Sequence, residues 1–372
     1  MPEKTKNKIK WTHFTSSQKL RTILLAGLSG LLLTAFLVHA CIQLYSDKKA
    51  EEIYWEEHFL APSDDILEKV AGKSAAAVPV TSGTYLETIK ELNIKSGFFR
   101  IEFLVWFCWE GHTNLNMKDH FRIYNATINK KDIIKDVYDP KTDLTYQQIR
   151  CDASVYQPFC TVRFPLENHQ LRFYVESDYP VEKAVFIEGK NSGVLNPDLS
   201  VNGYKITRNT SFVTAFAYPD KHDDPTMEGE LVHSELVSAL ELNRSSFGVY
   251  WKCTISLIGT TIWMFLILFV NAHHTVDPLG LIPPILVGAI SNVIVGTNLL
   301  PDALQTGLIE YINLLGMMSL ILIAITVINV NRVRNKDGDG TFAQFLGHLM
   351  FTILLTIVAA GFILIPLCAY HW

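Results

Sequence analysis

Hydrophobic and polar positions are strongly segregated along this chain. An apolar run at residues 22–45 contains no Asp, Glu, Lys or Arg, and a long polar block follows it. Further apolar runs gather at the C-terminal end, near residues 250–270, 279–295, 308–330 and 342–370. A helix of roughly 20 residues crosses the hydrocarbon core of a bilayer, and lipid offers no partner to open backbone amides. These runs therefore predict five membrane-spanning helices.

The run at residues 279–295 differs from the others because it contains Pro283, Pro284 and two glycines, Gly280 and Gly288. Proline removes a backbone donor and kinks a helix. The sequence therefore leaves open whether this helix is continuous.

Basic residues predict the orientation of the chain. The first 21 residues have a single acidic residue, Glu3, against six basic ones: Lys4, Lys6, Lys8, Lys10, Lys19 and Arg21. An excess of this kind indicates a cytoplasmic N-terminus. Five spans then place the polar block outside and the loop at residues 331–340, which also carries basic residues, inside. We therefore predict a multi-pass protein of the plasma (inner) membrane with an extracytoplasmic polar block.

The first apolar run has two interpretations. Val38-His39-Ala40 resembles the small-residue cleavage site of a secretory signal peptide. The run is longer than the usual apolar core of a signal peptide, which favours a retained anchor.

The polar block predicts an all-β sandwich after a helical connector. Residues 46–76 are charged and helix-prone, and from Val78 onward apolar side chains recur with a period of two. Residues 99–109 place Phe99, Ile101, Phe103, Val105, Phe107 and Trp109 on one face of a strand. Gly, Pro and Asn turns separate further short strand-like runs, which is typical of a sandwich. These runs are residues 121–128, 146–162, 170–175, 184–187, 204–206, 211–217 and 235–242.

The hydropathy and strand patterns divide the chain into five parts. These are a basic cytoplasmic tail (1–21), an N-terminal transmembrane helix (22–45), a charged helical linker (46–76), an extracytoplasmic β-sandwich (77–246) and a four-helix transmembrane bundle (247–372).

Motifs for catalysis are missing from the sequence. It has no nucleotide loop, no H-E-x-x-H and no nucleophile elbow, so we predict neither catalytic residues nor a cofactor, a metal centre or a nucleic-acid partner. Cys108, Cys151 and Cys160 lie in the polar block and allow at most one internal disulfide. Residues 220–224 surround His222 with carboxylates, a pattern that suits a solvated acidic loop or a sensor of protons or divalent cations.

Two stretches carry a family resemblance. Residues 164–176 read FPLENHQLRFYVE, and residues 292–311 read NVIVGTNLLPDALQTGLIEY. The first resembles the F-P-F-D-x-Q-x-L-x-I-x-x-E loop and strand of the pentameric ligand-gated ion channels, the Cys-loop receptor superfamily, with Leu171 at the position of the second loop cysteine. Bacterial members also lack that disulfide. The second is similar to the end of the family's pore helix, its outer turn and the acidic start of the next helix.

Shorter segments extend the resemblance to about residues 77–372. The segment from Trp106 to Trp109 resembles the aromatic strand at the family's ligand site, and residues 202–206 resemble its G-W-x-I strand. Arg244 resembles the arginine that precedes the first span of the bundle. The N-terminal helix is an addition to the family's pattern.

The resemblance implies a homopentameric, cation-preferring channel gated by a ligand or by protons. The axis of the pore would be lined by Leu279, Pro283, Leu286, Ile290 and Val293. Periodicity alone does not choose this face, because Leu281, Ile285 and Ala289 on the opposite face are also apolar. An apolar ring closes a narrow pore by dewetting, and five copies of Asp277 at the inner mouth would favour cations. Asp277 followed by proline also suits the start of a helix.

The resemblance also implies a gating junction and a ligand site. The junction would comprise Pro165, Glu167, Arg244, Pro301 and Asp302, with Glu167 and Arg244 forming an ion pair. A small amine, a proton or a divalent cation would bind between neighbouring subunits at Trp109, Asp178, Tyr179, Tyr218 and His222.

The alternative function is a non-conducting, membrane-anchored sensor or scaffold with a receptor-like sandwich. A third function, that of an integral membrane enzyme, has no support, because the predicted spans contain no constellation of His, Asp and Glu side chains.

Overall fold

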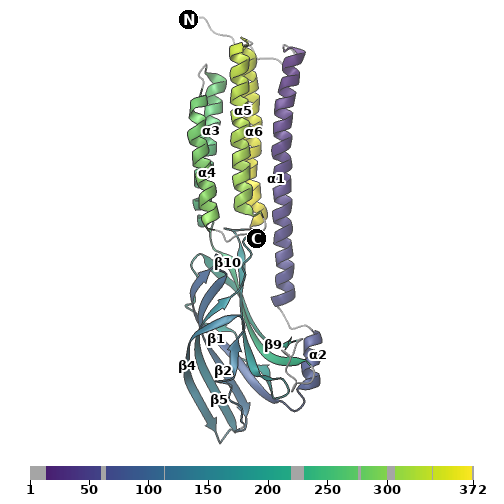
Figure 1. The fold of residues 1–372 in the computed structure, drawn as a ribbon, viewed down its shortest axis with the longest axis vertical. Coiled ribbons are helices and arrows are strands. Elements are labelled where there is room, and N and C mark those ends of the chain that lie inside the picture. Colours follow the sequence, from purple (N-terminus) through teal and green to yellow (C-terminus); the bar gives the residue numbers. More distant parts are fainter. Residues whose placement is uncertain are drawn as a thin grey trace. The chain divides into compact units, whose positions relative to one another are not determined.

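The computed structural model describes residues 14–59, 64–112, 114–218, 230–274, 278–299, 306–336 and 338–370. The chain forms two compact units. The helical unit comprises Met1–Lys49, Thr161–Glu167 and Phe247–Trp372, and the β unit comprises Ala50–Cys160 and Asn168–Ser246. Figure 1 shows the elements of both units.

The β unit contains two sheets. The first has the strand order β4-β5-β2-β1-β7, with β8 paired to β1, and the second, four-stranded sheet has the order β3-β6-β10-β9 (Figure 1). The strands are β1 (Val78–Asn93), β2 (Phe98–Glu110), β3 (Phe121–Ile123), β4 (Ala126–Asp139), β5 (Leu144–Tyr156), β6 (Asn168–Pro180), β7 (Ala184–Glu188), β8 (Val194–Leu195), β9 (Tyr204–Tyr218) and β10 (Leu231–Arg244).

The core of the β unit lies between the two sheets. The predicted inward face of β2 is confirmed, because its alternate residues from Phe99 to Phe107 are fully buried and Trp109 is only 2% exposed. The ring of Phe103 lies 4.7 Å from the ring of Phe173 on β6, which belongs to the other sheet. The period-two pattern therefore predicted this core correctly.

Three strand boundaries differ from the sequence-based expectation. The expected strand at 121–128 is two strands, separated at Asn125, whose φ of 52° lies in the left-handed region that asparagine tolerates. Residues 204–218 form one continuous strand, β9, where two runs were expected. Strand β5 ends at Tyr156, short of the expected Val162, because the segment Thr161–Glu167 belongs to the helical unit.

The helices are α1 (Ser16–Phe59), α2 (Asp64–Lys73), α3 (Gly248–His273), α4 (Ile282–Leu299), α5 (Leu308–Lys336) and α6 (Gly340–Ala369). Within the described residues, α1, α3, α5 and α6 are long and apolar enough to cross a membrane, whereas α4 is shorter. This composition is compatible with a membrane protein. Helix α1 continues well beyond the expected end at residue 45, and the division between the two units falls inside it.

The paired prolines lie at the start of α4. A short 3₁₀ turn at Leu279–Leu281 precedes it, and Pro283 and Pro284 occupy its first turn. The first amides of a helix have no intrahelical partner, so proline costs no hydrogen bond there. The helix is therefore continuous from Ile282 onward, which answers the question that the sequence left open.

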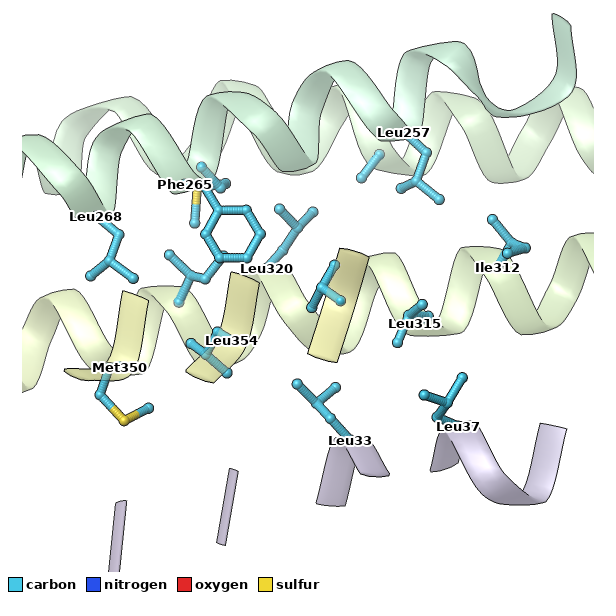
Figure 2. Packing of buried hydrophobic residues seen from close by; sticks show 14 of the residues in the cluster. Leu33, Leu37, Leu257, Phe265, Leu268, Ile312, Leu315, Leu320, Met350 and Leu354 are labelled. Atoms are coloured by element: carbon cyan, nitrogen blue, oxygen red, sulfur yellow. The ribbon is translucent and has the colours of Figure 1, made fainter. Parts of the chain in front are cut away.

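Close backbone approaches and polar pairs hold the helical unit together. A Cβ on Gly316 of α5 would lie 2.6 Å from a methyl group of Leu257 on α3, so this glycine permits the two helices to approach. The amide of Asn292 on α4 donates a hydrogen bond to Asn313 on α5, at 2.9 Å between Nδ2 and Oδ1. Figure 2 shows apolar side chains of α1, α3, α5 and α6 that gather in the core of the helical unit.

Helix α1 buries one stripe against the other helices. Leu33, Leu37, Ala40 and Leu44 recur at helical spacing and are at most 8% exposed (Figure 2 labels the first two). Polar contacts add to this packing, since Gln18 donates to Asp339 at the start of α6 (2.8 Å) and Arg21 donates to Asn329 on α5 (3.0 Å). Helix α1 thus packs as a member of the helical unit.

Candidate functional site

The outer face of the four-stranded sheet gathers charged side chains from strands far apart in sequence. Strands β3 and β9 are the two edges of this sheet, yet Arg122 of β3 donates a hydrogen bond to the phenol oxygen of Tyr218 of β9, at 2.7 Å. Both side chains reach Glu176 on the central strand β6: Arg122 forms an ion pair with it at 2.5 Å, and Tyr218 donates to it at 3.1 Å. The carboxylate of Glu176 is fully buried and receives both donors.

A second carboxyl group lies beside this cluster. Glu235 of β10 is paired in register with Glu176 and is 4% exposed. Within the described residues, no hydrogen bond or ion pair satisfies its side chain. The pKa of Glu235 is raised to about 8, mainly by burial and secondly by repulsion from Glu176. The positive charge of Arg122 opposes this shift. Glu176 thus has a cationic partner in Arg122, whereas Glu235 has no such partner among the described residues.

An aromatic pocket of about 490 Å³ opens on the same face, and Glu235 lines it. Its walls include Tyr124 of β3, Tyr174 of β6 and Phe216 of β9. The ring of Tyr124 lies 6.2 Å from that of Tyr174 and 6.0 Å from that of Phe216, so the rings form one continuous aromatic surface.

The last turns of α1 contribute the other side of this pocket. Glu51, Tyr54 and Trp55 line it, and the guanidinium of Arg172 lies 5.7 Å from the centre of the Tyr54 ring. These residues follow residue 49 and belong to the β unit. The segment that the sequence marked as a charged linker thus supplies part of a pocket wall.

The predicted ligand residues lie in different surroundings. Tyr218 lies in the charged cluster, whereas Trp109 is buried in the core between the two sheets. The ammonium of Lys183 lies 3.8 Å from the centre of the Tyr179 ring, and Asp178 is exposed. His222 lies outside the described residues. The sequence pattern indicated no ligand role for five residues of this face: Arg122, Glu176, Tyr124, Phe216 and Glu235.

The loop Thr161–Glu167 brings part of the predicted junction into the helical unit. Leu308, the first residue of α5, donates its backbone amide to the carbonyl oxygen of Val162 at 2.7 Å. Phe164 packs with Cys253 of α3 and Ile309 of α5, and the Arg163 side chain reaches the carbonyl oxygen of Ala369 at 3.4 Å. The loop therefore contacts the ends of three helices, α3, α5 and α6.

Other predicted junction residues lie in different surroundings. Pro165 follows a cis peptide bond, and Glu167 is 1% exposed within the helical unit. In the β unit, the guanidinium of Arg244 lies 4.1 Å from the centre of the Tyr204 ring. The ion pair between Glu167 and Arg244 stays a prediction. Pro301 and Asp302 lie outside the described residues.

The described part of α4 has one buried and one exposed side. Ile285 and Ala289 are buried against neighbouring helices. Of the residues predicted to line a pore, Pro283 and Ile290 are exposed, and the remaining three are half-buried: Leu279, Leu286 and Val293. Asp277 lies outside the described residues.

Other chemistry is sparse in the described residues. They contain no cluster of three or more His, Cys, Asp or Glu side chains that could hold a metal ion. The six cysteines, all of them in the described ranges, form no disulfide. No family model matches the chain, and neither does any curated protein.

Proposed function

We propose that the chain is a subunit of a homopentameric ligand-gated ion channel of the Cys-loop receptor type. One observation carries this proposal: the loop Thr161–Glu167 lies between two strands of the β unit yet packs among the ends of α3, α5 and α6. A second covalent connection runs from β10 into α3. Strands β6 and β10 are adjacent in one sheet, so both connections begin at its centre. Two short connections, the loop Thr161–Glu167 and the link from β10 to α3, would therefore transmit a conformational change in that sheet to the helices.

Helix α4 is the element that we propose to line the pore. Its buried side, with Ile285 and Ala289, is already used within the subunit, which leaves the side of Pro283 and Ile290 for the axis. Five copies of such an apolar face would form a hydrophobic constriction that closes by dewetting. Asp277 would then give the inner mouth its preference for cations.

Helix α1 is an additional helix that the family's pattern does not contain. Its stripe from Leu33 to Leu44 is buried against the other helices, which supports a retained helix rather than a removed signal peptide. The basic N-terminal tail supports a cytoplasmic N-terminus, which puts the β unit on the extracytoplasmic side.

Reconstitution tests the proposal. The purified full chain is incorporated into planar bilayers, and currents are recorded across a series of pH values and cationic ligands, while negative-stain images report the symmetry of the particles. We expect fivefold particles, discrete current steps and reversal potentials that follow the cation gradient. Silent fivefold particles would favour the sensor or scaffold function, and reversal potentials that follow chloride would contradict the role of Asp277. Particles without fivefold symmetry would overturn the proposal.

A further inference from the structure

Two cysteine side chains meet where α1 packs against α6. Cys41 lies on α1, Cys368 lies in the last turn of α6, and both are free thiols in this structure. The Cys41 thiol is hydrogen-bonded to the Cys368 thiol. A disulfide needs about 3.8 Å between the two Cβ atoms, so thiols in contact need little movement to form one.

The packing of the two helices accounts for this meeting independently of the thiols. The ring of Phe14, just before α1, lies 5.2 Å from the ring of Phe342 near the start of α6. Further along both helices, a Cβ on Gly30 would lie 3.8 Å from a methyl group of Ile353. The helices are therefore parallel, and on each of them almost the same number of residues lies between the aromatic contact and the cysteine. Because both helices rise equally per residue, the two thiols reach the same level.

We propose that Cys41 and Cys368 form a reversible disulfide bond that clamps α1 to α6. The oxidant is a disulfide compound. The thiolate of one cysteine attacks it and releases one thiol, and the thiolate of the other cysteine then attacks the mixed disulfide and releases a second thiol. One S–S bond thus replaces two S–H bonds in the protein, while the two electrons and the two protons pass to the disulfide compound, which becomes two thiols.

The position of the pair favours oxidation. Both side chains are half-buried, so a small reagent reaches them. The orientation proposed above puts these ends of α1 and α6 on the extracytoplasmic side, and disulfides persist in oxidising compartments. The compartment therefore rests on the proposed function, whereas the contact between the two thiols does not.

The bond would act beside the loop Thr161–Glu167. Ala369 follows Cys368 in the chain, and its carbonyl oxygen accepts a hydrogen bond from Arg163 of that loop at 3.4 Å. A disulfide would hold α1 against the same end of α6. A cross-link also lowers the entropy of the unfolded chain, so the oxidised protein should unfold at a higher temperature.

A metal ion fits the pair less well than a covalent bond. Zinc sites in proteins use three or four side-chain ligands, of which two cysteines supply two at most. The part of the chain that the structure describes contains no group of three or more His, Cys, Asp or Glu side chains suited to a metal ion.

Mass spectrometry of the purified full chain in nanodiscs tests the inference. The protein is treated with the disulfide compound 4,4′-dithiodipyridine, remaining thiols are blocked with N-ethylmaleimide, and trypsin digests the chain without reductant. Cleavage gives peptides 22–48 and 337–372, each with a single cysteine. We expect these two peptides to be joined by a disulfide in most molecules and to separate after treatment with dithiothreitol. Absence of the joined peptides would overturn the proposal.

Variants distinguish a specific bond from chance cross-linking. Cys368→Ala should abolish the joined peptides, whereas Cys253→Ala removes a buried thiol of α3 and should leave their yield unchanged. Cys41→Ala combined with Ile42→Cys moves the thiol by about 100° around α1, to an exposed position. We expect this displaced thiol to lower the yield at least tenfold. An equal yield would contradict the assignment of Cys41.

Thermal melts test whether the bond clamps the helices. The melting temperature of wild-type protein should be several degrees higher after oxidation than after reduction. Cys253→Ala should keep this difference, and Cys368→Ala should lose it. Equal melting temperatures of oxidised and reduced wild-type protein would contradict the clamp even if the joined peptides were found.

Discussion

The backbone amide of Leu308 donates a hydrogen bond to the carbonyl oxygen of Val162, with 2.7 Å between nitrogen and oxygen. Leu308 begins α5, and its amide is one of the first in the helix, which have no partner within the helix itself. The loop Thr161–Glu167 supplies that partner. The side chain of Glu310 caps the same helix end, because it accepts the backbone N–H of Gly307 at 3.0 Å.

Gly307→Ala should separate this loop from α5. A Cβ at position 307 would lie 2.5 Å from the carbonyl oxygen of Val162, and backbone at such a distance must move. We expect a loss of about 1–3 kcal/mol in the free energy of unfolding, the usual cost of overpacking. In bilayers, we expect the variant to lose its response to ligand while any remaining openings keep their unitary conductance.

Gly340→Ala is the matched control for that variant. Gly340 begins α6, and a Cβ there meets no atom within 4 Å. Melting temperatures and ligand-evoked currents of this control should equal those of wild-type protein. Equal behaviour of the two alanine variants would contradict the role of the loop contact.

Ile290→Thr tests the proposed hydrophobic constriction. Ile290 is 49% exposed on α4, and a hydroxyl group at a dewetted constriction favours water inside it. We therefore expect a standing current in the absence of ligand. Ile262→Thr on α3 changes the same residue type at a similarly exposed position (56%), and it should leave the closed state silent. If the wild-type channel is active but neither variant carries current in the absence of ligand, Ile290 does not belong to the constriction.

Glu235 makes the stability of the β unit depend on pH. Its pKa rises from an ordinary value of 4.5 to about 8 in the folded protein. Between these pH values the folded protein retains a proton that the unfolded chain releases, so the free energy of unfolding falls as the pH rises and levels off above about pH 8. Glu235→Gln should remove this slope, and at pH 9 it should be the more stable protein, by up to roughly 5 kcal/mol at about 1.36 kcal/mol per pKa unit.

Thermal melts at several pH values between 5 and 9, in detergent and without ligand, check this expectation. The two proteins should differ little at pH 5, where the carboxyl group is protonated in the folded state. A variant with the same slope as wild-type protein would show that another group titrates in this range. Glu110→Gln serves as the control, because Glu110 is exposed at the end of β2.

The sequence predicted the faces of strands better than the neighbours of strands. Alternation along β2 identified its buried side from Phe99 to Trp109, because burial in a sandwich follows the pleat. The same period says nothing about which strands are adjacent. Arg122, Tyr218 and Glu235 meet only because the sheet order is β3-β6-β10-β9, so this cluster was not found.

Strand β10 also illustrates why Glu235 escaped notice. Residues 232–240 of this strand are all buried, so alternation no longer distinguishes its two faces. The loop Thr161–Glu167 is a related case. Val162 and Leu166 read as strand or turn residues, yet they are buried in the core of the helical unit, a long-range contact that local pattern does not encode.

Asn292 and Asn313 should stabilise the contact of α4 with α5 as a pair. Their side-chain amides form a buried hydrogen bond of 2.9 Å, and a buried polar group that loses its partner is costly in an apolar bundle. We expect each single alanine substitution to lower the melting temperature and the double substitution to cost less than the sum of the two. Double-mutant cycles on hydrogen bonds between membrane helices give coupling energies of about 0.6–1.7 kcal/mol.

The free energies of unfolding of the four proteins in mixed micelles give this coupling directly. Asn329 of α5 bonds to neither Asn292 nor Asn313: it donates to the carbonyl oxygen of Ile325 in its own helix and accepts from Arg21 of α1. Pairing Asn292→Ala with Asn329→Ala therefore gives a control cycle, and its coupling should be near zero because distant sites contribute additively. A coupling near zero in the Asn292–Asn313 cycle as well would mean that this hydrogen bond contributes nothing net to the contact of α4 with α5.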